Sequence, residues 1–240
     1  MARKPGAGVC VHCLNYFHKR NWDHVMPRSW YPTSTPINME KWKIPTCIKC
    51  NSEYGVLEED MFTLLALTVE RSASSAGIHE RALRSIDPSQ GKSKGDRKSR
   101  LAKRNRIMTS IMKGGDIPSV GVYPGLGERW KRPVSDQIGV EIPAEYFEKF
   151  SEKITRGVHF IETGEFIEPP YKISFYAGEK DAIRPVSNII RTTGSRYARG
   201  PGLEIHRAVP HDDPKMSMSE ITLFGEVAMY SCVDNFDEQG

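Results

Sequence analysis

Four cysteines and an aspartate-histidine pair near the N-terminus are the residues whose types and spacing could do chemistry. The cysteines form two Cys-x-x-Cys pairs, which are Cys10 with Cys13 and Cys47 with Cys50. Asp23 and His24 lie between these pairs. Two such pairs supply the tetrahedral set of thiolates that zinc prefers. A site closed by four sulfurs leaves no position for a substrate, so we predict a structural zinc, with any chemistry elsewhere.

The segments around these residues must hold the two cysteine pairs together. Aromatic and β-branched residues surround Asp23 and His24, so we expect residues 14–27 to form a short β-hairpin. Residues 28–45 are rich in proline, serine and threonine and are expected to form an irregular loop. Apolar residues then recur at helical spacing, so a helix should begin near the second cysteine pair or shortly after Gly55. A cysteine knuckle, a hairpin and a second knuckle at a helix start make the arrangement called a treble clef.

The order of these motifs resembles the ββα-metal signature of HNH endonucleases. The variant that it resembles has asparagine as the third motif residue and a frame held by two Cys-x-x-Cys pairs. The matching segments are Asp-His-Val-Met-Pro from Asp23, then Asn38, then Cys-Ile-Lys-Cys-Asn ending at Asn51. The chain is most similar to a bacterial HNH-like subgroup of poorly defined role, and residues 153–165 also resemble that subgroup. The resemblance implies a metal-dependent endonuclease that hydrolyses phosphodiester bonds of DNA.

The resemblance also implies a role for each matched residue. His24 would be the general base, and Asn38 would orient the loop that carries it. Asp23 and Asn51 would bind a catalytic magnesium or manganese ion, which agrees with the preference of hard cations for oxygen ligands. Neighbouring residues of a strand point to opposite faces, so we expect a twist or bulge to bring Asp23 and His24 to one site. A helix start at Asn51 would direct its positive dipole end at an anionic substrate.

A basic segment follows the first 75 residues. We expect residues 88–96 to form an exposed loop and residues 99–113 to form a basic amphipathic helix. This stretch is either an ordinary solvated face or a surface that contacts nucleic-acid phosphates. The residues predicted to contact phosphates are Lys98, Arg100, Lys103, Arg104 and Arg106.

The sequence as a whole predicts an α+β protein in three parts. Residues 1–75 would form the zinc-stapled module, and residues 76–140 the basic helical segment with a linker rich in glycine and proline. Residues 141–240 would form a C-terminal α/β region, in which residues 142–162 read as a helix with Gly157 near its end. Alternating segments after that helix predict a small antiparallel sheet packed with it. No motif assigns this region a role, so substrate selection and self-association as a homo-oligomer both stay open.

The composition is that of a globular protein, with 38% hydrophobic and 27% charged residues among 240. No apolar run approaches the roughly 20 residues that span a bilayer, and no apolar signal segment follows the basic N-terminus. We therefore expect no membrane association and a cytoplasmic location, where thiols stay reduced and available for metal. The net charge of +4 is compatible with a nucleic-acid partner, which we expect to be DNA with RNA left open.

Metal-dependent DNA cleavage is the main prediction, and two other classes compete with it. One is a zinc-finger-like module that binds nucleic acid without cutting it, and the other is a protein-interaction module. Cleavage and binding alone differ only at Asp23, His24 and Asn51, all of which are present. His12 and His18 are alternative zinc ligands, because histidine also serves in such sites.

Overall fold

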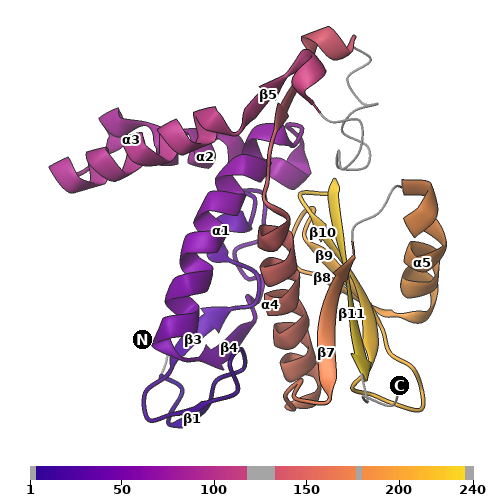
Figure 1. Cartoon of the computed structure of the whole chain (residues 1–240). Coiled ribbons are helices and arrows are strands. Elements are labelled where there is room, and N and C mark those ends of the chain that lie inside the picture. The colour runs from indigo at the N-terminus through magenta and orange to yellow at the C-terminus, as the bar shows by residue number, and fades with distance from the viewer. Residues whose placement is uncertain (1–3, 118–132, 177–179, 236–240) are drawn as a thin grey trace.

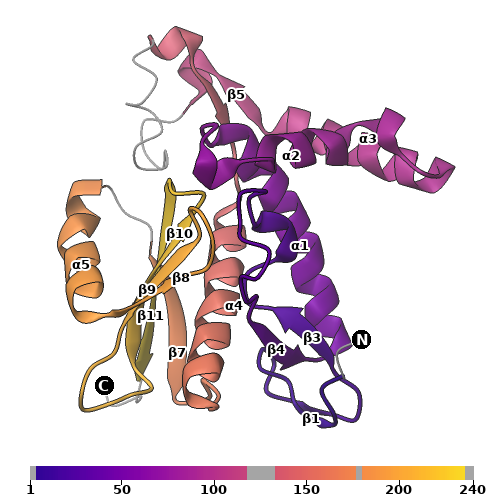
Figure 2. The ribbon, with the colours of Figure 1, turned by 180° about the vertical axis from the view of Figure 1, so that it is seen from behind.

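Two long helices run side by side through the middle of the molecule in the computed structural model (Figures 1 and 2), which describes residues 4–117, 133–176 and 180–235. They are α1 (Ile48–Thr68) and α4 (Ala144–Thr163). The N-terminal ribbons lie beside the first turns of α1, and a five-stranded sheet lies on the other side of α4. The architecture is α+β, as predicted. In the described part of the chain, no helix is long and apolar enough to cross a bilayer.

Two short antiparallel ribbons precede α1. The strand β1 (Gly8–Val9) pairs with β2 (Tyr16–Phe17), and β3 (Asn21–His24) pairs with β4 (Lys43–Thr46). The partner of β3 therefore comes from the far side of a long loop, and the prediction of a hairpin within residues 14–27 is wrong. That loop contains the short helix η1 (Arg28–Trp30), and its last residues form β4. The strand β4 ends at Thr46, and the next residue, Cys47, is the N-cap of α1.

The basic segment contains two helices, α2 (Ile78–Ile86) and α3 (Lys94–Thr109). The second helix begins within the predicted loop, because the side chain of Ser93 accepts a hydrogen bond from the backbone of Asp96 and caps it. The strand β5 (Ile111–Lys113) pairs with β6 (Ile138–Val140), and residues 118–132 of the predicted linker lie outside the described residues. The remaining short helices are η2 (Ala73–Ser75), η3 (Pro88–Gln90), η4 (Gly114–Asp116) and η5 (Val134–Asp136).

The C-terminal region is an antiparallel sheet with one helix on each face (Figures 1 and 2). In spatial order its strands are β7 (Tyr171–Tyr176), β11 (Val227–Asn235), β10 (Ser217–Leu223), β9 (Glu204–Ala208) and β8 (Ser195–Ala198). The helix α4 packs against β7 and β11, and α5 (Lys180–Thr193), which the sequence did not predict, packs against β9 and β10. Gly164, at a φ of 73°, ends α4, so Gly157 lies inside the helix and not near its end as predicted.

One hydrophobic core joins the N-terminal and C-terminal parts. Trp30, from the loop after β3, is fully buried, and its ring stacks on Phe150 of α4 with 4.4 Å between centroids. On the C-terminal side it stacks on Phe224, at the turn between β10 and β11. The absence of a side chain at Gly157 lets α4 approach Val25, which follows β3. The core therefore crosses the predicted boundaries between the three parts.

Candidate functional site

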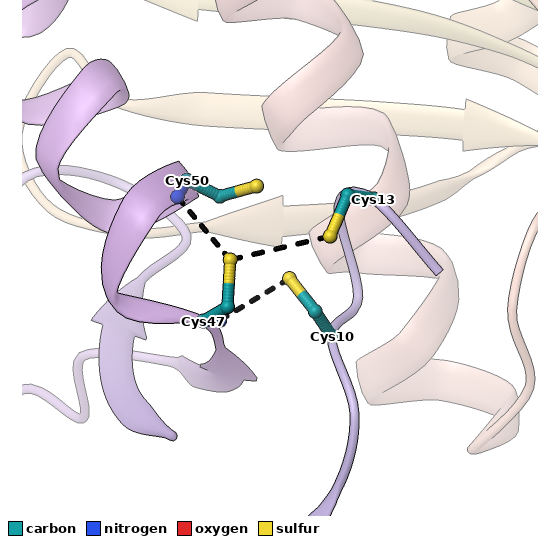
Figure 3. Close-up of side chains that lie close together, drawn as sticks. All are labelled: Cys10, Cys13, Cys47 and Cys50. Atoms are coloured by element: carbon teal, nitrogen blue, oxygen red, sulfur yellow. Dashed lines mark hydrogen bonds between the residues drawn. The ribbon is translucent and has the colours of Figure 1, made fainter. Parts of the chain in front are cut away.

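The four cysteines predicted to bind zinc meet in one cluster (Figure 3). All four sulfur atoms lie within 4.8 Å of one another, and those of Cys13 and Cys47 are 4.0 Å apart. Sulfurs about 2.3 Å from a central zinc ion would lie about 3.8 Å apart, so the cluster fits a tetrahedral zinc ion with small adjustments. Neither His12 nor His18 belongs to this group of ligand atoms in the described residues.

Hydrogen bonds from backbone amides stabilise negative charge on two of these sulfurs. The backbone amide of Cys47 donates to the sulfur of Cys10 over 3.2 Å, and the amide of Cys50 donates to the sulfur of Cys47 over 3.3 Å (Figure 3). Burial and the neighbouring sulfurs nevertheless raise the pKa of the Cys50 thiol. Several thiolates this close repel one another, so a bound cation is needed to keep the set deprotonated.

Asp23 lies at the centre of a buried cluster of charges. It is 7% exposed, accepts a hydrogen bond from Nε2 of His12 over 3.3 Å, and lies 3.1 Å from Nζ of Lys153 in α4. Lys153 is fully buried and also forms an ion pair with Glu58 of α1, while Tyr54 presents its ring 5.5 Å from the same nitrogen. Burial alone would raise the pKa of Asp23, but the bond from His12 and the charge of Lys153 lower it.

Neither Lys153 nor Glu58 was singled out in the sequence. One signal for Lys153 was available, because it lies three residues after Phe150 and one before Ile154, on the apolar face of the predicted helix. A lysine on such a face must find a counter-charge when it is buried. Its partner, Asp23, is 130 residues away in the sequence, so no local pattern identifies the pair.

The arrangement around Asp23 does not fit a magnesium or manganese ion. A divalent cation on this carboxylate would lie beside the ammonium group of Lys153, and like charges in a buried site repel strongly. Asn51 lies half-buried in the first turn of α1, and its side chain makes no hydrogen bond to a described residue. Asn38 is exposed and likewise makes no side-chain hydrogen bond in the described part of the chain, so nothing here ties it to the loop after His24.

His24 lies at the end of β3, directly opposite Lys43 of β4. The four pairs of this ribbon follow one another without the expected bulge, so Asp23 and His24 leave opposite faces. Burial, and then the charges of Lys43 and Arg28, lower the pKa of His24 to about 4. The ring is therefore neutral near pH 7 and able to accept a proton, although with a weak basicity.

The basic residues of α3 divide into two groups. Three of the five predicted phosphate contacts form ion pairs within the chain, which are Lys103 with Glu59 at 2.9 Å, Arg100 with Asp96 at 2.9 Å and Arg106 with Asp60 at 3.3 Å. Lys103 is only 5% exposed, so its charge serves to dock α3 on α1. Lys98 and Arg104 are exposed and form no ion pair with a described residue.

Comparisons with known proteins give no match. The chain matched no protein-family model, no curated protein and no solved structure. The resemblance to HNH endonucleases therefore rests on the quoted motifs alone and stays a prediction.

Proposed function

We propose that the chain is a zinc-stapled endonuclease of the HNH type, which hydrolyses phosphodiester bonds of DNA. The observation that carries the proposal is the way in which one sulfur cluster joins a ribbon to a helix. The strand β3 ends in Asp23 and His24, its partner β4 leads directly into Cys47, and α1 then places Asn51 in its first turn. We propose that this unit of ribbon, four-sulfur site and helix is a treble clef of the ββα-metal kind.

His24 is the residue whose role can be argued from its surroundings. Its ring accepts a proton from a water molecule while the oxygen of that water forms a bond to phosphorus. The bond from phosphorus to the leaving oxygen breaks, and the leaving oxygen keeps the electron pair and takes up a proton from solvent. Arg28 and Lys43 are exposed and carry positive charges that act on His24, so a phosphate at this ring would meet two cations. Lys98 and Arg104 provide further phosphate contacts on α3.

Binding of magnesium or manganese at Asp23 requires a rearrangement of the site. Asp23 has to exchange Lys153 for the metal before it can serve as a ligand, so we assign no step of the reaction to a metal. The structural zinc holds the ribbon and the helix together and takes no part in the chemistry.

A second function is favoured by the contact between Asp23 and Lys153. A module that grips nucleic acid without cutting it needs no metal at Asp23, and it would use the same cations, Arg28 and Lys43. The buried ion pair would then be a permanent part of its core.

A plasmid-nicking assay separates the two functions. The purified zinc-loaded chain is tested with magnesium, with manganese and with a chelator, and its zinc content is measured after each treatment. His24→Ala should lower the nicking rate roughly 10²-fold or more, the usual contribution of a positioned base, and leave nucleic-acid binding and zinc content intact. His18→Ala is the matched control, because His18 is an exposed histidine of the same module.

Two results would decide against cleavage with His24 as base. A parent chain that binds DNA but cuts no substrate with either metal is a binding module. A His24→Ala variant that cuts at the parental rate removes His24 from the reaction.

A further inference from the structure

The ammonium group of Lys153 occupies a cage built for a cation. Two carboxylates contact it, one from Asp23 of β3 and one from Glu58 of α1, and the ring of Tyr54 lies 5.5 Å away. Carboxylate oxygens and an aromatic face are the groups that stabilise a positive charge away from water. Lys153 itself has no exposed surface, so these partners take the place of bulk water around its charge.

We propose that Lys153 is the resident cation of this cage and that it excludes a hard divalent metal ion from Asp23. Both carboxylates contact the same nitrogen atom, so an ion at that point would be within reach of Asp23 and Glu58 together. These are the oxygen ligands that manganese and magnesium prefer. The metal and the ammonium group therefore compete for one position. Lys153 thus acts as an internal inhibitor of metal binding, with Glu58 as an additional ligand once it leaves.

Packing prevents Lys153 from leaving by a simple side-chain rotation. The residues of α4 on either side, Phe150 and Ile154, are fully buried. Gly157, which has no side chain, lets the helix lie close against Val25, the residue after β3. Opening the cage therefore requires a shift between α4 and the β3–β4 ribbon. The proposal rests on the proposed function only in taking Asp23 as a candidate metal ligand, and competition for the cage is measured without nucleic acid.

The test is a manganese titration of the zinc-loaded chain, followed by electron paramagnetic resonance of the free ion. The parent should show no manganese site that Asp23→Asn removes. Lys153→Met removes the charge and keeps the length of the side chain. It should gain one manganese site that binds the ion roughly tenfold or more tightly than any site of the parent does, because the repulsion is gone. The double variant with Asp23→Asn should lose that site.

Lys149→Met is the matched control. Lys149 lies one turn earlier on α4, is exposed and, among the described residues, forms an ion pair with Glu145 of the same helix, so its loss should leave manganese binding unchanged. Lys153→Gln is the substitute if Lys153→Met fails to fold, because its amide can still hydrogen-bond a carboxylate.

Two outcomes would overturn the proposal. One is a parent chain that already binds manganese at a site abolished by Asp23→Asn, a result that needs no Lys153 variant. The other is a folded Lys153→Met or Lys153→Gln chain that gains no manganese site. Because neither measurement involves DNA, a chain that never cuts leaves them unaffected, and the two proposals fail independently.

Discussion

Gly157→Ala tests whether the close approach of α4 to the β3–β4 ribbon holds the two parts of the molecule together. Gly157 lies in the interior of α4, where alanine is favoured over glycine by about 1 kcal/mol. On helix propensity alone, the substitution should stabilise the protein. The surroundings of this position predict the opposite sign.

The magnitude follows from the space around residue 157. A Cβ atom there would lie 2.8 Å and 3.0 Å from the two methyl groups of Val25 and 3.4 Å from Cδ1 of Ile44. Val25 is 2% exposed and Ile44 is fully buried, so neither has a free direction in which to move. Overpacking of this kind costs about 1–3 kcal/mol, and the gain in propensity offsets about 1 kcal/mol of it. We expect a net loss of about 0–2 kcal/mol.

Gly55→Ala is the matched control, because Gly55 lies inside α1 and an added Cβ would have no atom of the described residues within 4 Å, apart from its chain neighbours and the backbone of its own helix. That variant should be more stable than the parent by about 0.5–1 kcal/mol. Urea denaturation of the zinc-loaded chains, followed by circular dichroism, gives both free energies of unfolding. If Gly157→Ala stabilises the chain as much as Gly55→Ala does, the contact with Val25 is not tight and the argument fails.

Two further predictions concern the zinc site and a buried histidine. Elemental analysis of the parent should find about one zinc ion per chain. Cys47→Ser should lose the zinc and melt at a much lower temperature, because the free energy of zinc binding is part of the free energy of folding. A variant that melts like the parent would contradict this. Burial and the charge of Arg207 lower the pKa of His159 from 6.5 to about 4, against the smaller opposing effect of Glu165. The unfolded chain therefore binds a proton first, and stability should fall by up to about 3 kcal/mol as the pH drops from 6.5 to 4. The free energy of unfolding is measured by urea denaturation at several pH values, and His159→Gln should make it depend less on pH in this range. An unchanged slope between pH 7 and pH 5 would refute the assignment of this pH dependence to His159.

The parts of the fold that the sequence predicts well are those with a local signal. The spacing of the cysteines predicts their cluster, because two short knuckles need only be brought together by one ribbon. Apolar residues at helical spacing predict α4, and alternating residues predict β9, β10 and β11. Each helix or strand pattern is read within a single window of the chain, and each Cys-x-x-Cys pair is itself a local motif.

The features that the sequence does not predict depend on distant partners or on ambiguous signals. The helix α5 contains Pro185, a residue that normally argues against a helix interior. The pairing of β3 with β4 spans a long loop without a tight turn to announce it. The partnership of Asp23 with Lys153 is a tertiary contact, and it places an ammonium group on a carboxylate that the motif predicts to bind metal.

The burial of Trp30 has a consequence for the history of this chain. Its indole stacks on Phe150 of α4 and on Phe224 at the turn between β10 and β11, so the segment that carries the four cysteines packs against residues encoded far downstream. Recombination that moved the segment alone into another protein would expose this tryptophan to water, unless the new protein supplied aromatic rings in place of Phe150 and Phe224. We expect the segment to be inherited together with α4 and the sheet, and substitutions at positions 30, 150 and 224 to occur in concert across descendants.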